Sequence, residues 1–362
     1  MPPSLGLTRT DLDALPSYVP GRSPVDLARE LGLPEAIKLA SNEVPFGPLP
    51  GVVDAVAQAA ASSHRYPDMG VLALRGALAE RLGVAAERIV TGCGSVALCE
   101  HLMRASCLPG DEVVYAWRSF EAYPIIAATT AANSRRVPNT AGHAHDLPAM
   151  ADAITEQTRM VLVCNPNNPT GTSVRRAELD RFIAAVPDDV LMVLDEAYRE
   201  FVTDPDVPDG LAAYGDRPNV VVLRTLSKAW GLAGLRVGYL VAHPEVASAV
   251  RKVATPFGTS ALAQAAALAA LDQADEVARR CDLVIAERAR VTEAVRKLVP
   301  DVPESQANFL WLPLGERAAA FGAACESRGV IVRPFAGDGV RVTIGTPAEN
   351  DAFLAAAEAA IG

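Results

Sequence analysis

Short runs of apolar residues alternate with helical stretches through the middle of this chain. Five such runs occupy residues 89–90, 113–115, 160–163, 190–194 and 220–223. Several of them are continuous rather than alternating with polar residues, which is typical of strands buried on both faces. Strands of this kind, separated by helices, predict an α/β fold with a mostly parallel central sheet.

The segments on either side of this sheet predict further units. Residues 1–34 are rich in proline, and apolar residues at helical spacing then predict helices at 50–62 and 71–82. Beyond residue 243 the pattern predicts three more helices, at 244–254, 261–271 and about 275–298, and then short strands. We therefore expect an N-terminal arm at 1–45 that packs on the small domain, a large domain at 46–250 and a small α+β domain at 251–362.

Glycine-rich or polar segments follow each of the five predicted strands. In chain order they are TGCGS, WRSFEAY, CNPNNPTG, DEAY and TLSK. Because ligands of parallel sheets bind beyond the carboxyl ends of the strands, these segments predict a single binding site. The first segment also suits a phosphate, because it places backbone N–H groups at the start of a helix.

Lys228 is the residue in these segments that most strongly suggests covalent chemistry. The chain has only four lysines, and Lys252 and Lys297 lie in charged helical sequence that predicts exposure to solvent. Lys228 follows a buried strand instead, among hydroxyls and glycines and eight residues before Arg236. By itself this segment suits a solvated surface loop as well as a lysine that carries an aldehyde cofactor. The other four strand ends favour the cofactor.

Composition and charge exclude several classes of protein. The net charge of −10 over 362 residues lacks the basic character of a nucleic-acid-binding surface. The N-terminal sequence has no apolar core of a signal peptide, and the most apolar run, at 261–271, is shorter than the roughly 20 residues of a membrane span. The six cysteines show no CxxC pairing, so we expect reduced thiols. We expect no metal site, and His143 and His145 are expected to be solvated.

The motifs together resemble those of the fold-type I aminotransferases, which use pyridoxal 5′-phosphate (PLP). The matching segments are IKLASNE, RYPD, CNPNNPTG, LDEAY, LRTLSKAWGLAGLRVGY, SQANFLW and VRP, and they extend over nearly the whole chain. The resemblance is to the branch that holds histidinol-phosphate aminotransferases and the aromatic amino acid aminotransferases of actinobacteria. Within it, GCGSVALCE and WRSFEAYP are similar to the aromatic type. The implied fold is a large PLP-binding domain with a smaller α+β domain.

The resemblance implies roles for residues around the cofactor ring. Lys228 would bind the PLP aldehyde covalently and then move a proton between the substrate Cα and the cofactor. Asp195 would pair with the pyridinium nitrogen and keep the ring protonated. Tyr198 and Asn168 would hydrogen-bond the phenolic oxygen. Phe120 would stack on the ring, although the family more often has tyrosine at this position.

The resemblance also implies how the cofactor phosphate is held. Its ligands would be Gly94, Ser95, Thr225, Ser227 and Arg236, of which the arginine can bind phosphate through two parallel hydrogen bonds. Tyr66 is similar to a tyrosine that reaches the phosphate from the partner subunit, which implies a homodimer with shared active sites.

Four residues are implied in substrate binding. Arg341 would clamp the substrate α-carboxylate, with help from Asn42. Tyr18 and Arg333 match positions at which histidinol-phosphate enzymes meet the distal phosphate of the substrate. Here they would serve either a phosphate or an aromatic side chain, and a surface ion pair is an equally good interpretation of Arg333.

The expected function is transfer of the amino group between an aromatic L-amino acid and 2-oxoglutarate, in the cytoplasm. Histidinol-phosphate transamination is the alternative, and a PLP-dependent decarboxylase of a phosphorylated amino acid is less favoured. A PLP-sensing regulator would need a DNA-binding domain, for which the near full-length match leaves no room. The expected partners are therefore small amino acids and 2-oxo acids, with no nucleic acid and no membrane.

Overall fold

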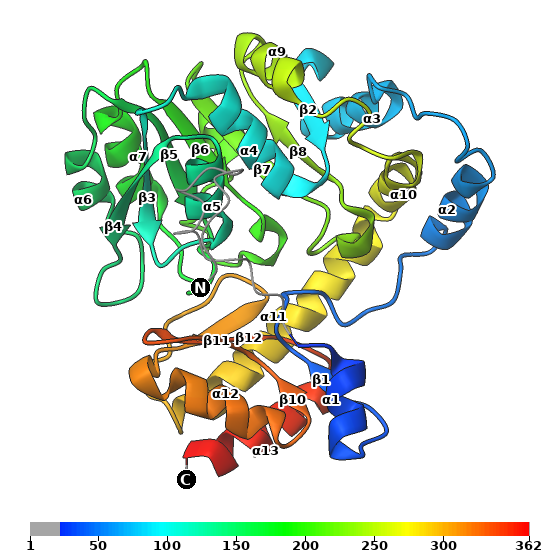
Figure 1. Ribbon diagram of the computed structural model, residues 1–362, viewed down its shortest axis with the longest axis vertical. Helices are drawn as coiled ribbons and strands as arrows, with labels where there is room; N and C mark the ends of the chain where they lie inside the picture. Colours follow the sequence, from blue (N-terminus) through cyan, green and yellow to red (C-terminus); the bar gives the residue numbers. More distant parts are fainter. Residues whose placement is uncertain (1–21, 362) are drawn as a thin grey trace, which may run out of the picture.

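A seven-stranded sheet forms the centre of the larger of two lobes (Figure 1). The computed structural model describes residues 22–361; Tyr18 and the first part of the predicted arm lie outside them. In spatial order the strands are β2 (Ile89–Gly92), β8 (Gly238–Val241), β7 (Val220–Thr225), β6 (Leu191–Asp195), β5 (Thr158–Cys164), β3 (Glu112–Trp117) and β4 (Asn133–Pro138).

All five predicted strands are present, and the predicted α/β class is confirmed. Strands β4, β3, β5, β6 and β7 run parallel, whereas β8 is antiparallel to both of its neighbours. Every residue of β6 and β7 is buried, as expected for continuous apolar strands between two layers of helices. The parallel strands therefore bring their carboxyl ends to one edge of the sheet.

Helices cover both faces of the large sheet. One face packs against α4 (Gly94–Ser106), α5 (Ala122–Thr129) and α9 (Pro244–Val253), and the other against α6 (Leu147–Asp152), α7 (Arg176–Ala185) and α8 (Gly210–Tyr214). Two separate apolar clusters fill the spaces between sheet and helices. This packing leaves the ends of the strands as the place where polar side chains can gather.

The smaller lobe is built on a three-stranded antiparallel sheet. Its strands lie in the order β11 (Arg333–Phe335), β12 (Gly339–Thr343) and β9 (Phe309–Leu312). A second pair joins β1 (Ile37–Lys38) to β10 (Val330–Ile331), so the segment after α1 (Pro24–Leu31) lies against the C-terminal region. Helices α12 (Ala318–Glu326) and α13 (Pro347–Ile361) complete this lobe.

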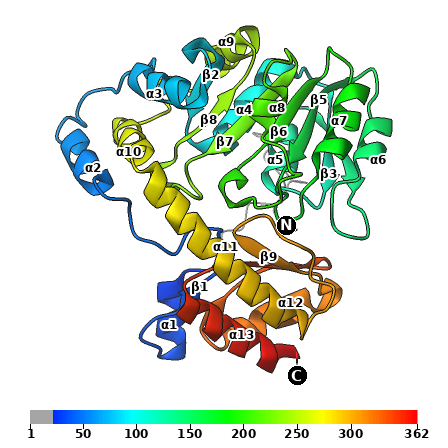
Figure 2. The same ribbon diagram turned by 180° about the vertical axis from the view of Figure 1, so that it is seen from behind.

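The 23-residue helix α11 (Ala274–Arg296) connects the two lobes (Figure 2). It follows α10 (Ala261–Leu271), which packs on α2 (Val52–Ala60) and α3 (Leu72–Leu82) of the larger lobe. The division of the chain at 45/46 and 250/251 stays a prediction, and the packing of α10 favours a boundary within α11. Among the described helices, none combines the length and the apolar character needed to cross a membrane.

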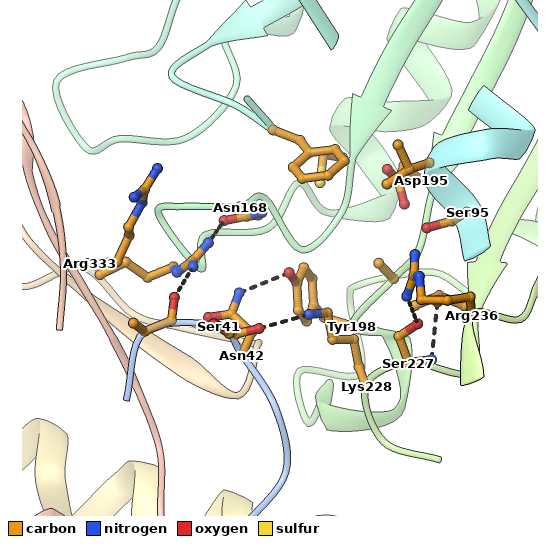
Figure 3. Close-up of a pocket in the computed structure, with 17 residues that line it drawn as sticks. Ser41, Asn42, Ser95, Asn168, Asp195, Tyr198, Ser227, Lys228, Arg236 and Arg333 are labelled. Carbon is orange, nitrogen blue, oxygen red and sulfur yellow. Dashed lines mark hydrogen bonds between the residues drawn. The ribbon is translucent and has the colours of Figure 1, made fainter. Parts of the chain in front are cut away.

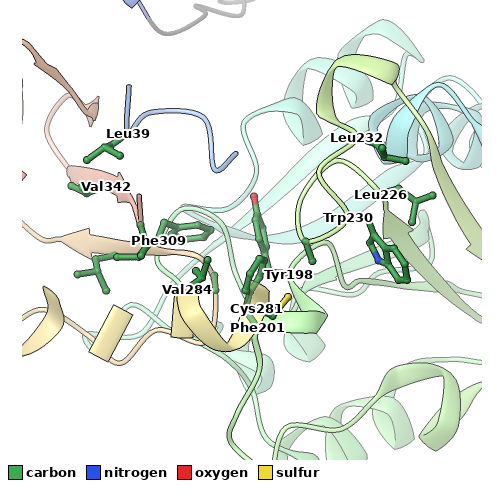
Figure 4. Close-up of a cluster of buried hydrophobic side chains, with 14 of the residues drawn as sticks. Leu39, Tyr198, Phe201, Leu226, Trp230, Leu232, Cys281, Val284, Phe309 and Val342 are labelled. Atoms are coloured by element: carbon green, nitrogen blue, oxygen red, sulfur yellow. The ribbon is translucent and has the colours of Figure 1, made fainter. Parts of the chain in front are cut away.

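The largest apolar cluster crosses from one lobe to the other (Figure 4). It joins Leu39, Phe309 and Val342 of the small lobe to Tyr198 and Trp230 of the large lobe. The Tyr198 ring meets the edge of the Phe309 ring, with 5.0 Å between ring centroids. The residue that the sequence assigns to the cofactor oxygen is therefore fixed by packing between the lobes.

Candidate active site

A pocket lies where the carboxyl ends of β5, β6 and β7 meet the start of α4 and the strands of the small lobe (Figure 3). Its lining contains twelve of the residues singled out from the sequence: Asn42, Ser95, Phe120, Asn168, Asp195, Tyr198, Thr225, Ser227, Lys228, Arg236, Arg333 and Arg341. Ala40, Ser41, Val96, Cys164 and Ala197 complete it. Residues that are far apart in the sequence are therefore brought to one site.

Lys228 lies just beyond the end of β7 and points into this pocket. Its Nζ donates a hydrogen bond to the carbonyl of Ser41 at 3.0 Å. Burial lowers the pKa of this amine to about 7, and the positive charge of Arg341 acts in the same direction. Near neutral pH a substantial share of the amine is unprotonated, which is the form that attacks an aldehyde.

Asp195 ends β6 and presents one unused carboxylate oxygen. Its Oδ2 accepts a hydrogen bond from the Tyr123 hydroxyl at 2.7 Å, whereas its buried Oδ1 has no hydrogen-bond partner among residues 22–361. Burial raises the pKa of Asp195 to about 6, against the lowering effect of Tyr123 and of the Ala197 N–H. A buried acceptor without a partner is costly. Asp195 Oδ1 therefore fits a cationic hydrogen-bond donor of a ligand. The protonated ring nitrogen of PLP would be such a donor.

Tyr198 and Asn168 are held by neighbours from the small lobe and the N-terminal segment (Figure 3). The Asn42 amide donates to the Tyr198 hydroxyl at 2.9 Å. Because the Tyr198 oxygen accepts this bond, its own proton is free to point at a ligand oxygen. Arg341 donates to Asn168 Oδ1 at 2.6 Å. The hydrogen bond from Asn42 to Tyr198 fixes the orientation of the Asn42 amide. The predicted contact of Asn42 with substrate stays a prediction.

A cradle suited to a phosphate lies at the start of α4. Helix α4 begins at Gly94, whose φ of +78° favours glycine, and the helix N-terminus supplies N–H donors. Arg236 donates to the Ser227 hydroxyl at 3.2 Å, and the Ser227 N–H donates to the Thr225 hydroxyl at 3.1 Å. A guanidinium, hydroxyls and a helix N-terminus are the groups that bind phosphate in proteins. The cradle therefore fits the PLP phosphate.

Substitution of Gly94 by alanine tests this cradle. A Cβ at this position would collide with the Arg236 guanidinium and would also occupy a left-handed backbone conformation. We expect PLP to bind roughly ten-fold or more weakly, as measured by fluorescence titration of the apoenzyme. Gly51→Ala is the matched control, because its φ of +75° is similar but nothing lies within 4 Å of an added Cβ. Equal PLP affinities in the two variants would contradict the assignment.

Arg333 lines the pocket and also forms an ion pair. Its guanidinium lies 3.1 Å from Glu121 Oε2, and its Cζ lies over the Phe335 ring at 5.5 Å from the centroid. An ion pair is therefore present, although it is partly buried rather than on the surface, and the contact of Arg333 with substrate stays a prediction. Sequence reasoning singled out neither Glu121 nor Tyr123, although both belong to the WRSFEAYP segment.

Of the predicted residues that the structure describes, Gly94 and Tyr66 are not among those that line this pocket. Gly94 lies at the start of α4, next to the Arg236 guanidinium. Tyr66 is 82% exposed and stacks on Phe257 with 4.5 Å between ring centroids, so its predicted contact with a partner subunit stays a prediction. Tyr18 lies outside the described residues. The expectation of solvated histidines is wrong for His145, which is buried. No cluster of three or more potential metal ligands occurs within residues 22–361.

Comparison with known proteins gives a consistent result over nearly the whole chain. Residues 34–356 match the family described as aminotransferase class I and II. The aromatic amino acid aminotransferase of Streptomyces avermitilis is 57% identical, over 97% of this chain and 96% of the relative. The aromatic amino acid aminotransferase of Rhodococcus jostii is 56% identical, over 96% of this chain and 94% of the relative. A solved structure of histidinol-phosphate aminotransferase from Sinorhizobium meliloti, with pyridoxal-5′-phosphate, superposes with a TM-score of 0.87 at 29% identity, covering 99% of this chain and 98% of that one.

Proposed function

The chain belongs to the class I and II aminotransferases and is a PLP-dependent enzyme, and we propose that it transfers the amino group between an aromatic L-amino acid and 2-oxoglutarate. Relatives more than 50% identical over nearly the full chain carry the name aromatic amino acid aminotransferase, which supports this substrate class. The observation within the site that carries the proposal is the ion pair between Arg333 and Glu121 at the edge of the pocket.

This ion pair bears on the choice between an aromatic ring and a phosphate. A phosphate carries close to two negative charges and binds best to cations that have no other partner. Arg333 is already neutralised by Glu121, and the aromatic ring of Phe335 lies beneath it. A substrate side chain near Arg333 would therefore meet a neutralised cation rather than a free one, which suits an aromatic ring better than a phosphate.

Histidinol phosphate remains the second candidate. The structural neighbour from Sinorhizobium meliloti has that activity in its name, and Arg333 would be a phosphate ligand if Glu121 released it. Decarboxylation of a phosphorylated amino acid is the third candidate and would need the same unpaired cation.

Each of four pocket residues would have its own role in transamination. PLP supplies a ring that accepts electrons from the substrate Cα. Lys228 Nζ would carry the proton removed from that carbon, Asp195 Oδ1 would hold a proton on the ring nitrogen, and the Tyr198 hydroxyl would donate to the phenolic oxygen. Arg341 would fix the substrate α-carboxylate, so that the reacting carbon lies close to Lys228.

Half-reactions with single substrates test the proposed function. We expect phenylalanine, tyrosine and tryptophan to convert the bound PLP to its amino form, followed by absorbance, with release of the matching 2-oxo acid. Rapid conversion by histidinol phosphate and none by phenylalanine would overturn the aromatic assignment. Release of carbon dioxide without a 2-oxo acid would overturn both transaminase assignments.

Replacement of Glu121 by glutamine should shift the substrate preference. The change frees the charge of Arg333, so the ratio of kcat/KM for histidinol phosphate to that for phenylalanine should rise roughly five-fold. Glu112→Gln is the control. Glu112 of β3 forms an ion pair with Arg135 of β4 at 2.8 Å, and neither residue lines the pocket. An unchanged ratio in the Glu121 variant would remove the support that the ion pair gives to the proposal.

We also propose a homodimer in which Tyr66 reaches the PLP phosphate of the partner subunit. Tyr66, Met69 and Leu72 are large apolar side chains that are more than half exposed, as is common at subunit interfaces. Light scattering that gives a monomer mass for the active enzyme would contradict this assembly.

We propose a cytoplasmic location as well. All six cysteines are free thiols, which supports this location.

A further inference from the structure

Tyr123 of helix α5 is in direct contact with Asp195, the last residue of β6. The tyrosine is fully buried, and its hydroxyl donates to Asp195 Oδ2 at 2.7 Å. We propose that Tyr123 is a positioning residue that holds the Asp195 carboxylate in one orientation, so that Oδ1 is kept for the PLP ring nitrogen and stays ionised. The proposal rests on the proposed role of Asp195.

Packing gives Tyr123 the rigidity that such a role requires. Its ring meets the edges of two other aromatic rings, those of Tyr115 at a centroid distance of 5.6 Å and of Phe120 at 5.5 Å. The whole side chain belongs to the apolar cluster between α4, α5 and the sheet. Close packing of this kind holds a buried side chain in place, so the position of the Tyr123 hydroxyl oxygen is fixed.

The carboxylate is also fixed from the strand side. The backbone of Asp195 pairs with Cys164 of β5, and its carbonyl accepts from the Asn165 N–H at 2.9 Å. With the main chain held by the sheet and Oδ2 held by Tyr123, the remaining oxygen Oδ1 is the one left for a ligand. Two elements of the fold, strand β6 and helix α5, therefore determine where that oxygen lies.

The electrostatic surroundings make the hydrogen bond from Tyr123 important for the charge of Asp195. The titratable groups that face this carboxyl are Tyr123, Tyr198, Cys99, Cys164 and Glu196, which are neutral or acidic. Burial raises its pKa to about 6, and the influences that lower the pKa are the Tyr123 hydroxyl and the Ala197 N–H. Loss of the hydroxyl would raise the pKa further, toward a neutral carboxyl at neutral pH.

The segment just before α5 also presents the residue predicted to stack on the cofactor. Phe120 lines the pocket, and the Tyr123 N–H donates to the Phe120 carbonyl at 3.0 Å. This hydrogen bond closes the turn that leads into α5 and fixes the two residues relative to each other. A single segment, FEAY, therefore controls both the face of the PLP ring through Phe120 and its nitrogen through Tyr123.

The test is substitution of Tyr123 by phenylalanine in the holoenzyme reconstituted with PLP labelled with ¹⁵N in the ring. We expect the ¹⁵N chemical shift to move toward that of a neutral ring nitrogen. We also expect the midpoint of the pH-dependent absorbance of bound PLP to rise by about one unit, because a positive ring nitrogen weakens proton binding elsewhere on the conjugated system. Tyr214→Phe is the matched control. Tyr214 is also buried and donates a 2.7 Å hydrogen bond to Asp180, but it does not line the pocket.

The outcomes separate this proposal from the one on which it rests. If Asp195→Asn moves the ¹⁵N shift and Tyr123→Phe leaves it where Tyr214→Phe does, the role of Tyr123 is overturned. If Asp195→Asn also leaves it unchanged, the role of Asp195 is wrong. Should Tyr123→Phe fail to fold, 3-fluorotyrosine at position 123 keeps the hydrogen bond with a more acidic donor. It should move both signals in the opposite direction, and no movement would overturn the proposal.

Discussion

Replacement of Lys228 by alanine should abolish transamination and leave PLP bound only by non-covalent contacts. Of the four lysines, all of which lie in the described part of the chain, Lys228 alone lines the pocket. Its lowered pKa of about 7 suits both attack on the aldehyde and later proton transfer. Proton transfer by a positioned side chain is worth about 10²- to 10⁴-fold in rate, so the loss should be at least of this size.

Borohydride reduction followed by peptide mass spectrometry checks this result. The wild-type protein should give a PLP adduct on the peptide that contains Lys228, and the variant should give none. Covalent binding in the wild type should become faster as the pH rises through about 7, because the amine loses its proton there. Lys297→Ala, at an exposed lysine near Glu293, is the control and should keep both adduct and activity. An adduct that persists in Lys228→Ala would contradict the central assignment of the site.

The elements that could be predicted from the sequence are those whose burial dictates their composition. Strands β5, β6 and β7 are buried on both sides, so their apolar runs identify them. Strand β4 has the sequence NSRRVP and lies at the edge of the sheet, where charged residues are tolerated and no apolar run is needed. Strand β8 is short and follows Arg236, in a segment where no strand was predicted from the sequence. Only pairing with β7 and β2 defines it.

The residues of the candidate site also differ in whether the sequence predicts them. Residues at strand ends, such as Asp195 and Lys228, were found because the geometry of a parallel sheet brings strand ends together. Tyr123 and Glu121 were missed because their partners lie 72 and 212 residues away in the chain. Such contacts depend on how α5 packs on β6 and how the small lobe meets the large one, and no local pattern encodes either arrangement.

The largest expected effect on substrate binding comes from substitution of Arg341 by lysine. Arg341 is buried in β12 and donates to Asn168 Oδ1 and to the carbonyl of Ala40, each at 2.6 Å. These contacts hold the planar guanidinium at the pocket. A lysine donates from a single atom and cannot keep this arrangement while binding a carboxylate through two parallel bonds. We expect kcat/KM for phenylalanine to fall about 10²- to 10³-fold, since two hydrogen bonds to a charged group are affected.

The choice of lysine separates the geometry of Arg341 from its charge. The positive charge of Arg341 helps to lower the pKa of Lys228, and lysine at position 341 keeps that charge, so the reactivity of Lys228 toward PLP should be preserved. Arg288→Lys is the matched control, because this buried arginine donates to the carbonyls of Phe201 and Ala307, both at 2.9 Å, outside the pocket. Both variants should lower the unfolding temperature, but only Arg341→Lys should raise KM while PLP affinity stays close to wild type. A parallel loss of PLP affinity in Arg341→Lys would instead place Arg341 among the cofactor ligands.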